Sequence, residues 1–244
     1  YLVDSPDEMR KSVRQAFKNG AENIKVMATG GVMSAGDNVD DTALTTTEMA
    51  VAVEEAHDKG KTVACHAQGH KGIQNALDAG VDSIEHGIYV DEDQADYMKE
   101  HGVFLVPTLN AANSISKYGV GKIPEYMIKK NDLVKSDFFK NIKMAFNHGV
   151  QIIVGTDAGT PFNSFKTGTI EEMELLVNEI GETPLQALQA ATINSAKALR
   201  VYENYGSIAV GKKANFVVLQ NNPLETIASF YGEKNVYKNG ERLV

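Results

Sequence analysis

The sequence predicts an α/β fold in which helices alternate with parallel strands. Amphipathic runs end five times in a glycine, and a short apolar run begins one to three residues later. Glycine commonly ends a helix, because it adopts the left-handed backbone conformation without strain. The apolar runs are nearly continuous rather than alternating, which is typical of parallel strands covered by helices. The five glycines are Gly20, Gly60, Gly80, Gly102 and Gly149.

The first expected helix covers residues 7–19, and the expected strands cover 24–28, 62–67, 83–87, 104–109 and 151–155. Thr45 and Glu48 form a capping-box pattern ahead of apolar residues at helical spacing, which predicts a helix that Gly60 closes. A helical run over 184–199 precedes a turn-rich stretch and a strand near 214–219. The segment 235–244 is expected to be a hairpin around Asn239-Gly240. We place the domain boundary between 1–203 and 204–244.

Composition narrows the possible classes of protein. The chain has 244 residues with 43% hydrophobic content, which suits one barrel-sized domain. Its net charge of −8 argues against nucleic acid or an anionic membrane surface as partner. Cys65 is the only cysteine, so neither a disulfide framework nor a thiolate zinc cluster is expected. Without a signal-peptide pattern or a membrane-length apolar run, we expect a cytoplasmic protein.

Four side chains that could share a metal ion occupy similar places in successive helix-strand units. They are Lys25, His66, His86 and Asp157, each five to eight residues after a helix-ending glycine. Because parallel strands end at one edge of a sheet, we expect these side chains to converge there. Neutral imidazole and carboxylate are ligands that suit Zn²⁺ and neighbouring divalent ions.

Several motifs together resemble the amidohydrolase superfamily. They are the segments 23–32 (NIKVMATGGV), 84–87 (IEHG), 155–159 (GTDAG) and 206–219. Within that superfamily they are most similar to the imidazolonepropionase-like branch, which includes prolidases and arginine carboxypeptidases. The resemblance implies a (β/α)8 TIM barrel of the metal-dependent hydrolase type flanked by a β-sandwich. On this basis the chain supplies the five C-terminal β/α units, strands 4 to 8, and part of the sandwich.

The resemblance also implies a set of ligands. Lys25 becomes a carbamate formed with CO2, which bridges two ions, most simply zinc, with Mn, Co or Fe as alternatives. His66, His86 and Asp157 complete the ligands in this chain, and Asp157 also carries a proton. Attack of a metal-bound hydroxide would then hydrolyse the C–N bond of a small amide or dipeptide. The family's His-X-His pair is absent from the sequence, so we expect a fragment of a longer protein.

Other interpretations stay open at this point. His66 and His86 could be core histidines, Asp157 could cap a turn, and Lys25 could form a structural salt bridge to Glu85. Lys25 could instead be the amine of a Schiff-base barrel enzyme. The chain could also be a non-catalytic binding fragment, or a barrel enzyme with a different metal reaction such as phosphotriester hydrolysis.

Substrate contacts are predicted more loosely. His70 could touch substrate or cap a helix, and Tyr118 lies in an expected long loop, 110–124, beside the site. The glycine-rich segment 30–36 lacks a phosphate-binding pattern, which favours a loop at the substrate mouth. No arginine falls in an expected rim loop, so a substrate carboxylate could be bound by Lys117, Lys122, Lys166 or His70, or by a group upstream of this chain. We expect a homo-oligomer, because open strand edges favour association.

Overall fold

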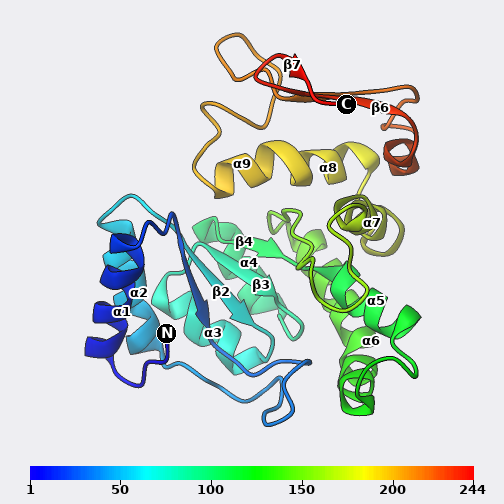
Figure 1. The fold of residues 1–244 in the computed structure, drawn as a ribbon. Helices are drawn as coiled ribbons and strands as arrows, with labels where there is room; N and C mark the ends of the chain where they lie inside the picture. The colour runs from blue at the N-terminus through cyan, green and yellow to red at the C-terminus, as the bar shows by residue number, and fades with distance from the viewer. The chain divides into compact units, whose positions relative to one another are not determined.

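The computed structural model describes residues 1–244, which form two compact units. The first unit contains Tyr1–Pro107 and Val120–Gln151, and the second contains Thr108–Gly119 and Ile152–Val244. The colour gradient of Figure 1 follows the chain through both. The predicted boundary at residue 203 stays a prediction.

A four-stranded parallel sheet forms the centre of the first unit (Figure 1). The strands follow one another in the order of the sequence, as expected for repeated β/α units. The strands predicted near 24–28, 62–67 and 83–87 are confirmed. The strands are β1 (Ile24–Met27), β2 (Val63–Ala67), β3 (Ser83–His86) and β4 (Phe104–Val106).

Helices connect and cover these strands, and their ends follow the predicted signals. The capping box of Thr45 and Glu48 is present at the start of α2, and Gly80, at φ 83°, ends α3. Helices α1 and α2 pack side by side, with Arg10 and Arg14 of α1 bound to Glu55 of α2. The helices of this unit are α1 (Pro6–Lys18), α2 (Thr46–His57), α3 (His70–Ala79), α4 (Glu92–His101) and α6 (Glu125–His148).

The two faces of the sheet differ in chemistry. Ile24, Val26, Cys65 and Ile84 are buried and form part of the apolar core. Strand register pairs Lys25 with Ala64, and His66 with Glu85, so these side chains point to the opposite face. Alternation along each strand therefore collects polar groups on one face and apolar groups on the other.

Two predicted strands are corrected by the structure. The strand expected over 104–109 ends at Val106, because Pro107 has no N–H to donate and Thr108 turns the chain at φ 54°. The strand expected over 151–155 does not join the four-stranded sheet. Leu105 N of β4 donates a hydrogen bond of 3.0 Å to Gln151 O. β4 has only three residues, so it offers a short edge for pairing with a further strand.

The second unit combines helices with a small antiparallel sheet of order β5-β6-β7. Asn239 and Gly240 have φ of 52° and 84°, so the predicted hairpin is confirmed. The helical run expected over 184–199 is also confirmed, with a π-helical turn inside it. The helices are α5 (Leu109–Tyr118), α7 (Gly168–Leu175), the π-helix η1 (Leu176–Ile180), α8 (Pro184–Gln189), the π-helix η2 (Ala190–Asn194), α9 (Ser195–Ala198) and the 3-10 helix η3 (Ile227–Tyr231). The strands are β5 (Phe216–Leu219), β6 (Lys234–Lys238) and β7 (Glu241–Arg242).

Helix α5 replaces most of the loop expected over 110–124. Its first turn is anchored by Glu172, whose carboxyl oxygens accept hydrogen bonds from Leu109 N and Asn110 N at 2.8 and 2.7 Å. Burial raises the pKa of Glu172 to about 8. The helix therefore depends on a partner 62 residues away in sequence, which local patterns do not reveal.

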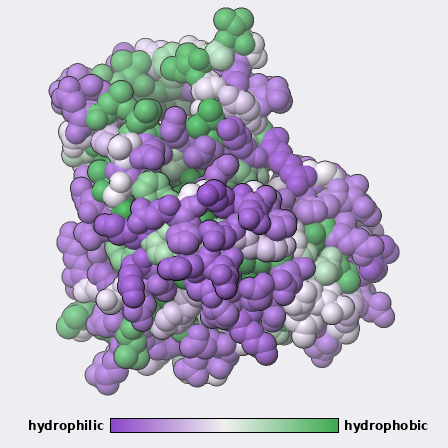
Figure 2. Space-filling model, turned by 180° about the vertical axis from the view of Figure 1, so that it is seen from behind, coloured by the Kyte–Doolittle hydropathy of each residue, from purple (hydrophilic) through white to green (hydrophobic).

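The surface is mostly polar. Figure 2 shows hydrophilic residues over much of the face seen from behind, with hydrophobic residues scattered among them. Exposed apolar side chains include Leu2, Phe165, Ile208 and Val210. None of the helices combines the length and apolar character that crossing a bilayer requires.

Candidate functional site

Four polar side chains meet near the carboxyl ends of β1, β2 and β3. We call Lys25, His66, Glu85 and His86 the strand-end cluster. Register places Met27 beside His66, and Ala67 beside His86, so the ends of these strands lie level with one another. The predicted convergence of Lys25, His66 and His86 is present within the first unit.

His86 reaches this cluster through an unusual backbone. Simple alternation would point it to the same face as Ile84, but its φ is 71° and Gly87 follows at φ 65°. A non-glycine residue in the left-handed region is uncommon and often marks a functional position. The ring centroids of His86 and His66 lie 4.6 Å apart in an edge-on arrangement.

Burial and nearby positive groups determine the protonation of His86. Burial first, then the charges of His66 and Lys25, hold its pKa well below the usual value. The imidazole is therefore neutral near pH 7, which is the form that binds metal ions.

His66 is buried, and its Nε2 lies 3.1 Å from Gly30 O. A carbonyl oxygen only accepts hydrogen bonds, so the ring donates and carries its proton on Nε2. In this tautomer Nδ1 is the nitrogen with the lone pair. A histidine that ligates a metal through one ring nitrogen commonly donates a hydrogen bond from the other, which orients the ring.

Lys25 forms an ion pair with Glu85, the salt bridge weighed as an alternative from the sequence. Ser83 Oγ also donates to Glu85, at 2.6 Å. This ion pair involves the nitrogen that the predicted carbamate would need, and the carbamate stays a prediction.

Cys65 takes no part in this cluster. Its thiol is buried on the helix side of the sheet, where Sγ lies 3.9 Å from Met49 Sδ. Burial raises its pKa to about 12, so the thiolate that binds zinc does not form at neutral pH.

Asp157 belongs to the second unit and lies exposed on a tight loop, at φ 54°. Its carbonyl accepts a hydrogen bond from Thr160 Oγ1 at 2.8 Å. Asn163 holds the same loop, because its Nδ2 donates to Thr156 O at 2.5 Å. The role of Asp157 as ligand and proton carrier stays a prediction.

His70 and Tyr118, the two residues predicted to contact substrate, each lie beside an identified side chain. His70 is the first residue of α3, and its Nε2 lies 2.7 Å from Asp91 Oδ2. Tyr118 ends α5, and its ring centroid lies 6.3 Å from that of Phe162. Lys117 Nζ lies 5.1 Å from the Tyr118 ring centroid. Binding of substrate by His70 or Tyr118 stays a prediction.

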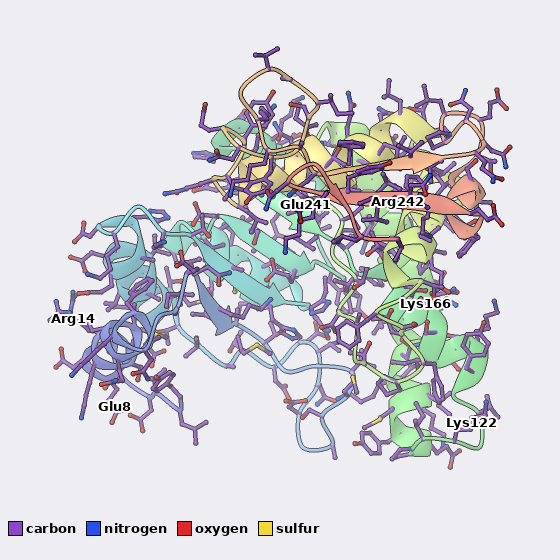
Figure 3. All side chains as sticks on the ribbon, turned by 45° about the horizontal axis from the view of Figure 1, so that its top comes forward. Glu8, Arg14, Lys122, Lys166, Glu241 and Arg242 are labelled. Carbon is purple, nitrogen blue, oxygen red and sulfur yellow. The ribbon has the colours of Figure 1, made fainter.

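The positively charged side chains that could bind a substrate carboxylate differ in their surroundings. Arg14, labelled on α1 in Figure 3, binds Glu55, and Arg242 lies on β7. Lys122 and Lys166, also labelled, extend from segments outside the helices. Binding of a substrate carboxylate by one of these lysines stays a prediction.

The donor set fits a divalent ion in part. His66 and His86 offer two imidazoles at one strand end. Gln68 follows His66 by two residues, and its buried Oε1 has no hydrogen-bond partner, so it is an acceptor suited to a cation or its water. No group of three or more His, Cys, Asp or Glu side chains has metal-binding geometry.

The sequence profile of the amidohydrolase family matches residues 2–243. The chain belongs to the amidohydrolase family. It is 35% identical to ochratoxinase of Aspergillus niger over 247 residues, which cover 98% of this chain and 50% of that protein. The chain thus spans about half the length of the relatives it matches.

Solved structures agree with this family membership. A Xaa-Pro dipeptidase with methionine bound in its active site matches with a TM-score of 0.90 and 36% identity, over 98% of this chain and 59% of the other. A prolidase complexed with N-methylphosphonate-L-proline matches with a TM-score of 0.90 and 32% identity, over 99% and 59%. The α/β fold therefore matches amidohydrolase barrel structures over about six tenths of their length.

Sequence patterns did not reveal every residue that holds this site. Lys130 of α6 binds three backbone carbonyls in and directly after the glycine-rich segment, next to His66. Asn163 fixes the loop of Asp157. Lys130 resembles any lysine of an amphipathic helix, and Asn163 resembles any loop asparagine, so neither carries a signal in a single sequence.

Proposed function

We propose that the protein is a metal-dependent hydrolase of C–N bonds in small amides or peptides. The observation that carries this proposal is the meeting of His66 and His86, ring centroids 4.6 Å apart, beside Lys25 at the carboxyl ends of neighbouring strands. Family membership supports it, since the relatives include an ochratoxinase and a Xaa-Pro dipeptidase.

Each residue has a separate task in this proposal. His66 and His86 would hold a divalent ion, most simply zinc, through neutral imidazole. Lys25 would leave Glu85, take up CO2 and provide the anionic bridge between two ions. A bound divalent ion lowers the pKa of a water molecule toward neutrality, which supplies the nucleophile. Asp157 would carry a proton to the leaving nitrogen.

The proposed substrate is an amide or dipeptide with a carboxylate. Relatives with bound methionine or a phosphonate-proline ligand support an amino-acid portion. Tyr118 and Phe162 offer aromatic surface, and Lys117 offers a positive charge beside Tyr118. We propose that these groups and His70 contact the substrate.

Metal content of the whole protein tests the proposal. We expect about two zinc ions per chain in wild type, and a clear loss in His66→Ala and in His86→Ala, measured by elemental analysis. His101→Ala is the matched control, because His101 Nδ1 bonds only to Tyr97 O of its own helix and should leave the metal content unchanged. Two results together would favour the Schiff-base mechanism instead. Wild-type protein would contain no metal, and borohydride would covalently fix a carbonyl substrate to Lys25.

A further inference from the structure

Lys130 holds the glycine-rich loop, which we define as residues 30–37. Its Nζ donates to Gly31 O at 2.5 Å, Asp37 O at 2.7 Å and Ser34 O at 2.8 Å. A lysine ammonium has three hydrogen-bond donors, and here three carbonyl oxygens use all of them. The side chain is only 18% exposed, and Asp37 Oδ1 lies 3.5 Å from the same nitrogen.

The glycine-rich loop lies directly against His66. Gly30 O accepts the hydrogen bond from His66 Nε2, and a Cβ on Gly31 would lie 3.5 Å from His66 Cε1. The residue above the ring is therefore the same residue whose carbonyl binds Lys130. Two covalently linked residues connect the lysine to the imidazole.

The rest of the loop offers few other attachments to α6. Tyr126 donates its hydroxyl to Met33 O at 3.2 Å, and Gly31 N donates to Asp37 Oδ1 at 3.3 Å inside the loop. Carbonyl groups of an irregular segment cannot pair with each other, so the ammonium replaces the missing backbone donors. Loss of Lys130 would leave these three oxygens without that shared donor.

We infer that Lys130 is a positioning residue that holds the glycine-rich loop on His66 and thereby fixes the imidazole with its proton on Nε2. It acts through Gly30 and Gly31 and touches neither substrate nor ligand atoms. The inference rests on the proposed function where it concerns metal binding, but its effect on the His66 tautomer does not.

Lys130→Met in the intact protein tests this role. It removes the donors while keeping an apolar chain of similar length. We expect zinc affinity, measured by competition with a chromogenic chelator, to fall by about 10- to 100-fold, the range seen for residues that orient ligands. Lys129→Met is the matched control, since Lys129 is 69% exposed and pairs only with Glu125 on the same helix. It should change the affinity by less than about twofold.

A second measurement reports on His66 itself. Nitrogen NMR of the metal-free protein should show the Nε2-protonated tautomer in wild type and in Lys129→Met, and a mixture in Lys130→Met. For Lys130→Ala, n-propylammonium supplies the deleted atoms and should restore the single tautomer. Tetramethylammonium has no N–H donor and should not restore it.

The results separate the two claims. Wild-type protein that binds no zinc rejects the proposed function, and the tautomer measurement still judges Lys130. An unchanged tautomer in Lys130→Met overturns the positioning role, whether or not the variant unfolds at a lower temperature. Equal restoration of the single tautomer by n-propylammonium and by tetramethylammonium also overturns it.

Discussion

Lys25 could exist in two forms that exclude each other, an ammonium or a carbamate. As an ammonium it pairs with Glu85, and as a neutral amine it could become the carbamate that the proposed site requires. The energy of a partly exposed ion pair is small, so binding of metal ions to a carbamate can outweigh it. The structure thus contains the salt bridge that the sequence offered as an alternative, and the carbamate role of Lys25 stays a proposal.

Glu182 gives a prediction about pH at the scale of one residue. Its side chain is 5% exposed, its Oε2 makes no hydrogen bond, and burial raises its pKa to about 7. The unfolded chain releases this proton near pH 4.5, whereas the folded chain holds it to about pH 7. The contribution of Glu182 to stability is therefore fully present below pH 4.5 and is lost as the pH rises through 7.

Glu182→Gln should remove this loss. We expect a gain of about 1–3 kcal/mol in the free energy of unfolding at pH 8 and little change at pH 4.5. Denaturant titrations at the two pH values measure it, with exposed Glu179→Gln as control. An equal effect of Glu182→Gln at both pH values would show that its charge in the folded state is not the cause.

At the scale of elements, the sequence predicted the helices and strands whose end signals lie within a few residues of them. Gly80 and Gly149 end α3 and α6 at φ 83° and 91°, and continuous apolar runs follow them in the chain. These features are visible in a single sequence because cap and apolar run lie within a few residues. The strands of Lys25, His66 and His86 were predicted for this reason.

Elements that depend on distant partners were not predicted. The start of α5 depends on Glu172, and residues 151–155 do not join the four-stranded sheet. The same limit applies to the site. The histidines follow recognisable strands, whereas Lys130 acts from α6 on a loop almost 100 residues earlier.

Gly69→Ala tests how the loop before α2 packs on the turn before α3. A Cβ on Gly69 would lie 2.7 Å from both Asp40 Cα and Val39 O, which are backbone atoms. Because the backbone yields less easily than a side chain, we expect a loss of about 1–3 kcal/mol in the free energy of unfolding.

Gly36→Ala provides the comparison for this substitution. A Cβ there would meet nothing within 4 Å, so its stability should stay within about 0.5 kcal/mol of wild type. Chemical denaturation measures both variants. Equal stabilities for the two would contradict the packing described for Gly69.

At the scale of the whole molecule, the parallel sheet has an edge strand, β1, that bears on association. β1 pairs with β2 and with no other strand, and Met27 on β1 is 49% exposed. An edge strand with free backbone groups favours association with another chain. We therefore expect the 244-residue chain to self-associate, as judged by sedimentation velocity.

Met27→Lys should weaken this association, because a charge on an edge strand opposes pairing. Met33→Lys adds the same charge at a loop position of comparable exposure and should leave association unchanged. A monomeric wild-type chain would contradict the prediction, as would equal effects of the two substitutions.

The central claim is that Lys25, as a carbamate, completes a metal site formed with His66 and His86. The most direct test is the rate at which whole protein with Lys25→Ala hydrolyses a dipeptide, with zinc present and with or without a short carboxylic acid such as acetate. We predict that the variant loses activity and regains part of it when acetate supplies the missing carboxylate. Full activity without any added acid would contradict it.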